Sequence, residues 1–172
     1  MAGTVYDVTD KKTGQTTSER IIKPIIVIPE WANKKENVQP LNVNFSTKFN
    51  FLYVGLWGDK GGYGEDRKNI ANLVKFFFNT FKDEKDVGLV LKTNIINASA
   101  EDKLNTVKRI EDIKSNFKNA KCKVHLIHQH LSDEEMSALY THPQIKAYLG
   151  IQHGEGYGLP LLEAAAAGLP VI

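Results

Sequence analysis

The feature that most constrains the fold of this chain is a glycine-rich stretch near its end, residues 153–165. An apolar run, residues 145–151, precedes it and has the length of a buried strand. The segment that follows, residues 161–167, is rich in Leu and Ala and favours a helix. Pro160 stands where the first helical residue is expected. The stretch therefore predicts a strand, a turn and a helix N-terminus, a geometry that offers backbone amides to an anion.

Two carboxylates flank this expected anion site. Glu155 lies in the turn, and Glu163 is expected in the first turn of the helix, pointing back toward the same side. A carboxylate only accepts hydrogen bonds, and its two oxygens suit a vicinal diol. Backbone amides can bind a diphosphate, and the two flanking carboxylates can each bind a diol. This combination of groups predicts a binding site for a nucleotide sugar.

Residues 155–163 read Glu-Gly-Tyr-Gly-Leu-Pro-Leu-Leu-Glu. They resemble the signature of the retaining GT-B glycosyltransferases of group 1, the large GT4-like family of sucrose and mannosyl transferases. That signature is a Glu, seven residues and a second Glu around a Gly-aromatic-Gly-Leu-Pro core, and every fixed position matches here. Residues 168–172, Gly-Leu-Pro-Val-Ile, extend the match. The alternative interpretation is a plain βα turn in an unrelated Rossmann-like domain.

The resemblance implies an α/β fold, the C-terminal donor-binding half of GT-B: a Rossmann-like parallel sheet with helices on both faces. It implies transfer of a hexose from a nucleotide-diphosphate sugar with retention of configuration, without a metal or another cofactor. Glu163 would hold the ribose hydroxyls, and Glu155, expected to act in catalysis, the hydroxyls of the transferred sugar. Backbone amides of the turn would stabilise the leaving diphosphate. The further donor-binding residues expected here are His153, Gly156, Tyr157, Gly158 and Leu159, with the Tyr157 ring packed behind the loop. For His153, a cap of the preceding strand is the alternative.

Cations of the same site are expected in the loop after the strand at residues 49–55. The family carries an Arg directly after this strand and a Lys at the start of the next helix, both on the diphosphate. Lys68 matches the Lys and is expected to act in catalysis, but the Arg position holds Leu56. Arg67, or Lys60, is expected to replace the missing charge. Gly58, one of four glycines in this loop, completes the expected donor-binding set.

The chain before the compact domain is expected to be a remnant of an N-terminal domain. Residues 4–8 and 17–28 read as the two arms of a β-hairpin. Residues 29–46 are polar and Asn-rich and read as an inter-domain linker. The predicted boundaries are therefore 1–46 for hairpin and linker and 47–172 for the nucleotide-sugar-binding domain. Because the family continues beyond the last residue, a truncated fragment without activity of its own is expected.

From residue 49 onward, strand and helix patterns alternate, which predicts a parallel sheet. The helix beginning at Ile70 has its apolar residues on one face. Ser99 with Asp102, and Ser132 with Glu135, read as capping boxes of two further helices. The strands are expected at residues 49–55, 88–93, 123–127 and 145–151, with another beginning at Val171.

Three histidines near the third strand, His125, His128 and His130, suggest a metal site at first sight. Alternation along a strand would put His125 and His128 on opposite faces of the sheet. Histidines that are hydrogen-bonded within the fold or face solvent are therefore the preferred interpretation, and no metal site is predicted.

Composition narrows the class of protein. The net charge of +2, without a basic stripe, argues against nucleic acid as a partner. A single cysteine, Cys122, excludes an internal disulfide and suits a reducing compartment. No apolar run has the length of a membrane span, and no export signal begins the chain, so a cytoplasmic location is expected. The expected partners are a nucleotide-sugar donor and a glycan, lipid or protein acceptor bound through a missing N-terminal domain.

Two other functions remain open at this stage. A sugar-nucleotide epimerase shares the GT-B fold, although it does not normally carry the Glu-to-Glu signature. A non-catalytic nucleotide-binding module is the second alternative, and Leu56 in the Arg position favours it.

Overall fold

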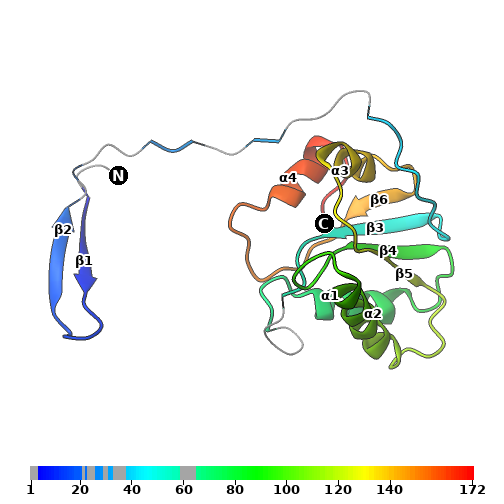
Figure 1. Ribbon diagram of the computed structural model, residues 1–172, viewed down its shortest axis with the longest axis horizontal. Helices are drawn as coiled ribbons and strands as arrows, with labels where there is room; N and C mark the ends of the chain where they lie inside the picture. The colour runs from blue at the N-terminus through cyan, green and yellow to red at the C-terminus, as the bar shows by residue number, and fades with distance from the viewer. Residues whose placement is uncertain (1–3, 21, 23–25, 29–30, 33–37, 59–64) are drawn as a thin grey trace. The chain divides into compact units, whose positions relative to one another are not determined.

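The computed structural model describes residues 4–20, 22, 26–28, 31–32, 38–58 and 65–172 (Figure 1). The chain divides into two compact units, Met1–Glu30 and Trp31–Ile172, and each is described by itself. None of the helices in the described part of the chain is both long and apolar enough to cross a lipid bilayer.

The first unit contains the predicted hairpin. Strands β1 (Val5–Thr9) and β2 (Thr16–Arg20) pair antiparallel, and the Asp10 carboxylate accepts from the backbone N–H of Lys12 in the turn. The predicted second arm, residues 17–28, is too long. Val5 pairs with Arg20, so β1 offers no backbone partner beyond that point, and residues 22 and 26–28 lie in no strand. Residues 23–25 lie outside the described part of the chain.

The second unit is built on a four-stranded parallel sheet, as predicted. Its strand order is β5-β4-β3-β6. Val171 forms a parallel bridge to Tyr148 and so marks a further strand position beside β6. The strand predicted over residues 145–151 ends three residues earlier, at Tyr148. The strands are β3 (Phe49–Val54), β4 (Val87–Lys92), β5 (Lys123–Ile127) and β6 (Ile145–Tyr148).

Helices cover both faces of this sheet (Figure 1). Side-chain alternation along β4 divides the core: Leu89 and Leu91 pack with α1 and α2, whereas Val90 packs with α3 and α4. Helix α3 begins with the predicted capping box of Ser132 and Glu135, in which each side chain bonds the other residue's backbone N–H. The helices are α1 (Ile70–Phe81), α2 (Ala100–Lys114), α3 (Asp133–Tyr140) and α4 (Leu159–Ala166).

Part of the expected linker is packed on the second unit. Leu41, Val43 and Phe45 contact the core beneath α3 and α4. The Gln144 amide holds the segment, accepting from Phe45 N at 3.1 Å and donating to Phe45 O at 2.8 Å and Thr47 O at 2.9 Å. Residues 41–46 alternate between apolar and polar side chains, a strand-like period of two that sequence reasoning missed because the segment is rich in Asn.

A buried polar cluster lies where this segment enters β3. Thr47 Oγ1 donates to Asn50 Oδ1 and lies 2.8 Å from His125 Nε2. Asn50 Nδ2 donates to Gln144 O at 3.0 Å. Gly88 on β4 leaves room for this cluster, because an added Cβ would overlap both Asn50 Oδ1 and Thr47 Oγ1.

Gly88→Ala therefore tests how tightly this cluster is packed. Overfilling a packed interior costs about 1–3 kcal/mol, and we expect a loss of that size in the free energy of unfolding measured with urea. Gly58→Ala is the matched control, since an added Cβ there meets no atom within 4 Å. Equal stability of the two variants would contradict the close packing around Gly88.

Candidate functional site

The strand order places a reversal of winding direction between β3 and β6. The chain leaving β3 turns to α1 on one face of the sheet, and the chain leaving β6 turns to α4 on the other (Figure 1). Ligands of open α/β sheets bind at such a reversal, outside the carboxyl ends of the strands. The loops after β3 and β6 are therefore where a site is expected on topology alone.

These two loops are joined by hydrogen bonds. His153 N donates to Arg67 O at 3.0 Å, and Arg67 Nη1 donates to Gly154 O at 2.7 Å. Asn69, in the left-handed conformation at the start of α1, donates through Nδ2 to Ile151 O at 3.0 Å. Residues distant in sequence thus form one continuous surface at the carboxyl edge.

A charge cluster lies at the junction of the two loops. Lys68 Nζ forms an ion pair with Glu155 Oε1, and Arg67 Nη1 lies 3.4 Å from Glu155 Oε2. The side chains of Lys68 and Glu155 are 15% and 20% exposed, so this pair is partly shielded from solvent, whereas Arg67 is 59% exposed. Lys68 and Arg67 share the Glu155 carboxylate, so these three side chains together carry a charge of +1, and the buried carboxylate of Asp66 precedes them in the chain.

Arg67 brings a second cation to Lys68 where the resemblance left one missing. Leu56, at the position of the family's Arg, is 48% exposed and carries no charge. Lys60, the other expected replacement, lies outside the described residues.

The glycine-rich turn leads into α4 as expected, with one correction. Gly158 has a φ of +80° and forms the N-cap of α4, a conformation that favours glycine. Helix α4 begins at Leu159, so Pro160 is its second residue and not its first. Tyr157 is 52% exposed, and the packing of its ring behind the loop stays a prediction. The amides of Gly156, Gly158 and Leu159 donate to no acceptor within the described residues.

Glu163 lies deeper in the helix than predicted. Because α4 begins at Leu159, Glu163 falls in its second turn. Its Oε2 accepts a hydrogen bond of 2.9 Å from the hydroxyl of Tyr140, the last residue of α3. Sequence reasoning missed Tyr140, since nothing local connects two residues 23 positions apart on different helices.

Two buried polar atoms near this edge have no hydrogen-bond partner among the described residues, Tyr53 Oη and Gln152 Oε1. Tyr53 is the fifth residue of β3, and an added Cβ at Gly55 would lie 2.7 Å from its hydroxyl. Burial raises the pKa of Tyr53, with Tyr148 and Glu155 adding to the effect, so the phenol stays protonated. Sequence reasoning missed both groups, although each stands at or just after the end of a predicted strand.

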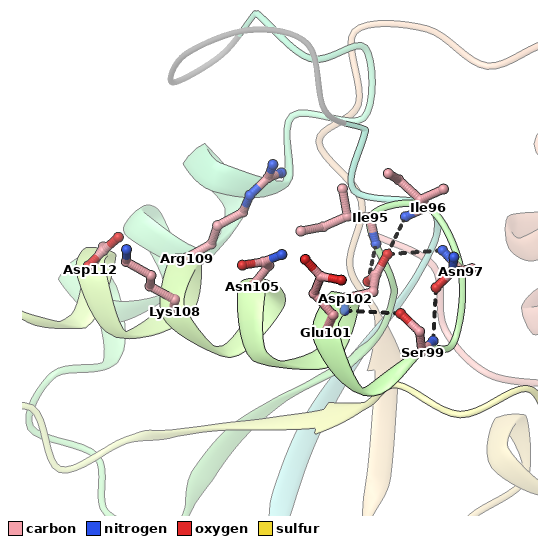
Figure 2. Close-up of a pocket in the computed structure, with 10 residues that line it drawn as sticks. All are labelled: Ile95, Ile96, Asn97, Ser99, Glu101, Asp102, Asn105, Lys108, Arg109 and Asp112. Carbon is pink, nitrogen blue, oxygen red and sulfur yellow. Dashed lines mark hydrogen bonds between the residues drawn. The ribbon is translucent and has the colours of Figure 1, made fainter.

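The loop after β4 is organised by a buried carboxylate, Asp102. Ser99 Oγ accepts from Asp102 N as predicted, but the reciprocal half of the expected capping box is absent. The Asp102 side chain instead accepts from the backbone N–H of Ile95, Ile96 and Asn97 (Figure 2). It is also 2.7 Å from His128 Nε2, so it ties the loop after β4 to the loop after β5.

A hollow of about 390 Å³ opens beside this loop, between residues 95–99 and the polar side of α2 (Figure 2). None of the site residues expected from the sequence lines it. Gly58 lies near it, where its carbonyl accepts from Arg109 Nη1 at 3.3 Å, and not in the cluster around Glu155.

Two of the three histidines in and after β5 are hydrogen-bonded within the fold. His125 bonds to Thr47, and His128 to Asp102, while His130 is exposed. Burial lowers the pKa of His125, and the charge of Lys123 lowers it further. In the part of the chain that the structure describes, no three His, Cys, Asp or Glu side chains are grouped as metal ligands.

Asp102→Asn tests the carboxylate that organises the loop. Burial opposes the charged form, but three backbone N–H groups and His128 outweigh it and hold the pKa of Asp102 below its usual range. We expect a loss of about 1.5–3 kcal/mol in the free energy of unfolding at neutral pH. A lowered pKa in the folded state contributes stability that is complete above about pH 4 and is lost as the pH falls further.

The difference between the parent and Asp102→Asn should therefore close as the pH is lowered, which urea titrations at a series of pH values measure. Asp112→Asn, an exposed change on the same helix, is the control and should have little effect. A difference that does not depend on pH would contradict the charged state of Asp102.

Solved structures with similar folds are found, although no protein-family model and no curated protein sequence matches this chain. The C-terminal domain of a glycosyl transferase group 1 family protein, LpcC of Francisella tularensis, matches with a TM-score of 0.53 at 20% identity. The match covers 73% of this chain and 57% of that domain. The apo structure of OtsA matches with a TM-score of 0.58 at 10% identity, over 95% of this chain and 38% of its own.

At these identities the similarity establishes the fold. The second unit has the Rossmann-like architecture of the C-terminal half of GT-B glycosyltransferases, which confirms the predicted fold class. This chain spans 57% of the length of the LpcC structure and 38% of the length of the OtsA structure.

Proposed function

We propose that the second unit binds the nucleotide-diphosphate sugar donor of a retaining glycosyltransferase. The observation that supports this most is the convergence of Lys68 and Arg67 on Glu155 at the reversal between β3 and β6. Two cations, a carboxylate suited to a diol, and backbone amides that have no acceptor among the described residues lie together at the carboxyl ends of the strands. Ligands of open α/β sheets bind at this edge.

Each group has a proposed part in the reaction. Lys68 and Arg67 bind the diphosphate together with the amides of Gly156, Gly158 and Leu159, and stabilise its charge as the sugar leaves. Glu155 accepts from hydroxyls of the transferred sugar, and Glu163 from those of the ribose. The diphosphate competes with Glu155 for the two cations, so donor binding releases Glu155 toward the sugar. A cytoplasmic location, an acceptor held by another domain and the absence of a metal requirement belong to the same proposal.

A panel of nucleotide sugars tests this function on a protein that also carries the acceptor-holding domain of this proposal, because the second unit by itself is expected to be inactive. Sugar transfer to an added acceptor, or slow hydrolysis of the donor, supports a glycosyltransferase. An epimerised sugar nucleotide would identify the product of an epimerase instead. Binding without turnover supports a non-catalytic nucleotide-binding module, the alternative that the exposed Leu56 favours.

Lys68→Met tests the cation on the diphosphate. Losing a hydrogen bond to a charged group costs about 1.5–3 kcal/mol, so we expect the affinity for nucleoside diphosphates to fall about ten- to a hundredfold. Lys85→Met is the control, because Lys85 is exposed and precedes β4 at the opposite edge of the sheet. Calorimetric titration measures the nucleotide affinity of each variant. Equal affinities of the two variants would contradict the placement of Lys68 in the site.

Substitution of the two glutamates separates their roles. Glu163→Ala should weaken the bare nucleoside diphosphate and the nucleotide sugar alike, about ten- to a hundredfold. Glu155→Ala frees two cations, so it should not weaken the bare nucleoside diphosphate, and its loss should appear with the sugar attached. Calorimetry with both ligands gives the comparison. If Glu155→Ala weakened the bare nucleotide as much as Glu163→Ala does, this division of roles would be wrong.

A further inference from the structure

Helices α3 and α4 are in contact through Tyr140, a residue to which the proposed function gives no role. Tyr140 ends α3, is 4% exposed and packs in the core that α3 and α4 share. Its hydroxyl lies 2.9 Å from Glu163 Oε2 on α4. A buried side chain of one helix thus holds the carboxylate of another.

The direction of this hydrogen bond is determined by chemistry. A carboxylate accepts only, so the Tyr140 hydroxyl is the donor. Burial raises the pKa of Tyr140, and the adjacent charge of Glu163 raises it further, so the phenol keeps its proton at physiological pH. Tyr140 can therefore donate to Glu163 throughout the physiological pH range.

The other oxygen of Glu163 remains available. Within the described residues Glu163 Oε1 has no hydrogen-bond partner, and the side chain is partly exposed. A carboxylate fixed through one oxygen presents the second in a defined direction. Fixing it in advance reduces the conformational entropy that a ligand would otherwise have to remove on binding.

We propose that Tyr140 is a positioning residue that orients Glu163 toward the ribose diol of a nucleotide. This rests on the proposed function and deepens it, because it adds a second helix to the recognition of the ribose. Tyr140 touches no ligand and acts through Glu163 alone. Its removal should therefore matter only when both Glu163 and the diol are present.

Tyr140→Phe deletes the hydroxyl and keeps the ring. Immobilising one side chain costs about 0.5–1.5 kcal/mol, so the affinity for UDP, GDP or ADP, whichever binds best, should fall about two- to tenfold. Tyr148→Phe is the matched control: it deletes a buried hydroxyl in the same core that donates to Val54 O at 3.0 Å and does not touch Glu163. Its nucleotide affinity should equal that of the parent.

Two cycles separate positioning from a general loss of packing. With a 2′,3′-dideoxynucleoside diphosphate, which lacks the diol, Tyr140→Phe and the parent should bind equally. In Glu163→Gln, adding Tyr140→Phe should cost less than it does in the parent, since residues acting through one another are not additive. If the Phe variant does not fold, para-methylphenylalanine at position 140 fills the hydroxyl's space without a donor and repeats both cycles.

The outcomes of these measurements distinguish a failure of the positioning role of Tyr140 from a failure of the proposed function. If no nucleoside diphosphate binds the parent, the proposed function and the inference both fail. If one binds, but the penalty of Tyr140→Phe persists with the dideoxy ligand, adds fully to that of Glu163→Gln or is absent, only the inference is overturned.

Discussion

The reversal of winding between β3 and β6 is the constraint on which the rest of the site depends. Because β6 lies beside β3 and not beyond β5, the loops that leave these strands meet at one edge and then part to opposite faces. Residues 67–69 and 151–155, distant in the sequence, are thereby joined by backbone and side-chain hydrogen bonds. A different strand order would separate Lys68 from Glu155 whatever the local sequence.

The electrostatics of that edge explain how a partly buried cation is tolerated before a ligand arrives. Lys68 is mostly shielded from water, and a shielded charge without a partner is costly. Glu155 supplies the partner, and Arg67 adds a more exposed cation to the same carboxylate. We propose that an arriving diphosphate, which offers more acceptor oxygens than one carboxylate, takes the place of Glu155 on both cations and leaves neither of them unpaired.

The elements were predictable where one periodic pattern decided them. The spacing of apolar residues in α1 and the capping box of α3 identified both helices, and the glycine-rich turn correctly predicted the start of a further helix, α4, near residue 160. What could not be predicted depends on tertiary partners. The end of β2 is determined by the length of β1, and the packing of residues 41–47 depends on Gln144. Glu163 falls in the second turn because the helix starts at Leu159, one residue earlier than expected, and its contact with Tyr140 has no local signal.

Asp102 shows how a correct local motif can still mislead. Ser99 caps α2 as its spacing predicts, yet the carboxylate three residues later turns to the loop after β4. Three amides from that loop present more hydrogen bonds than the single amide of the N-cap, so the longer-range arrangement is favoured.

We propose that a nucleotide binds at the carboxyl edge between β3 and β6. Mapping of backbone amide chemical shifts by NMR during titration with UDP, GDP and ADP tests this site most directly. We expect at least one of these nucleotides to shift the amides of residues 55–58, 67–69, 153–159 and 161–163 and to leave those of β1 and β2 unchanged. Absence of shifts with all three, or shifts confined to the opposite edge around Gly88 and Gln144, would contradict it.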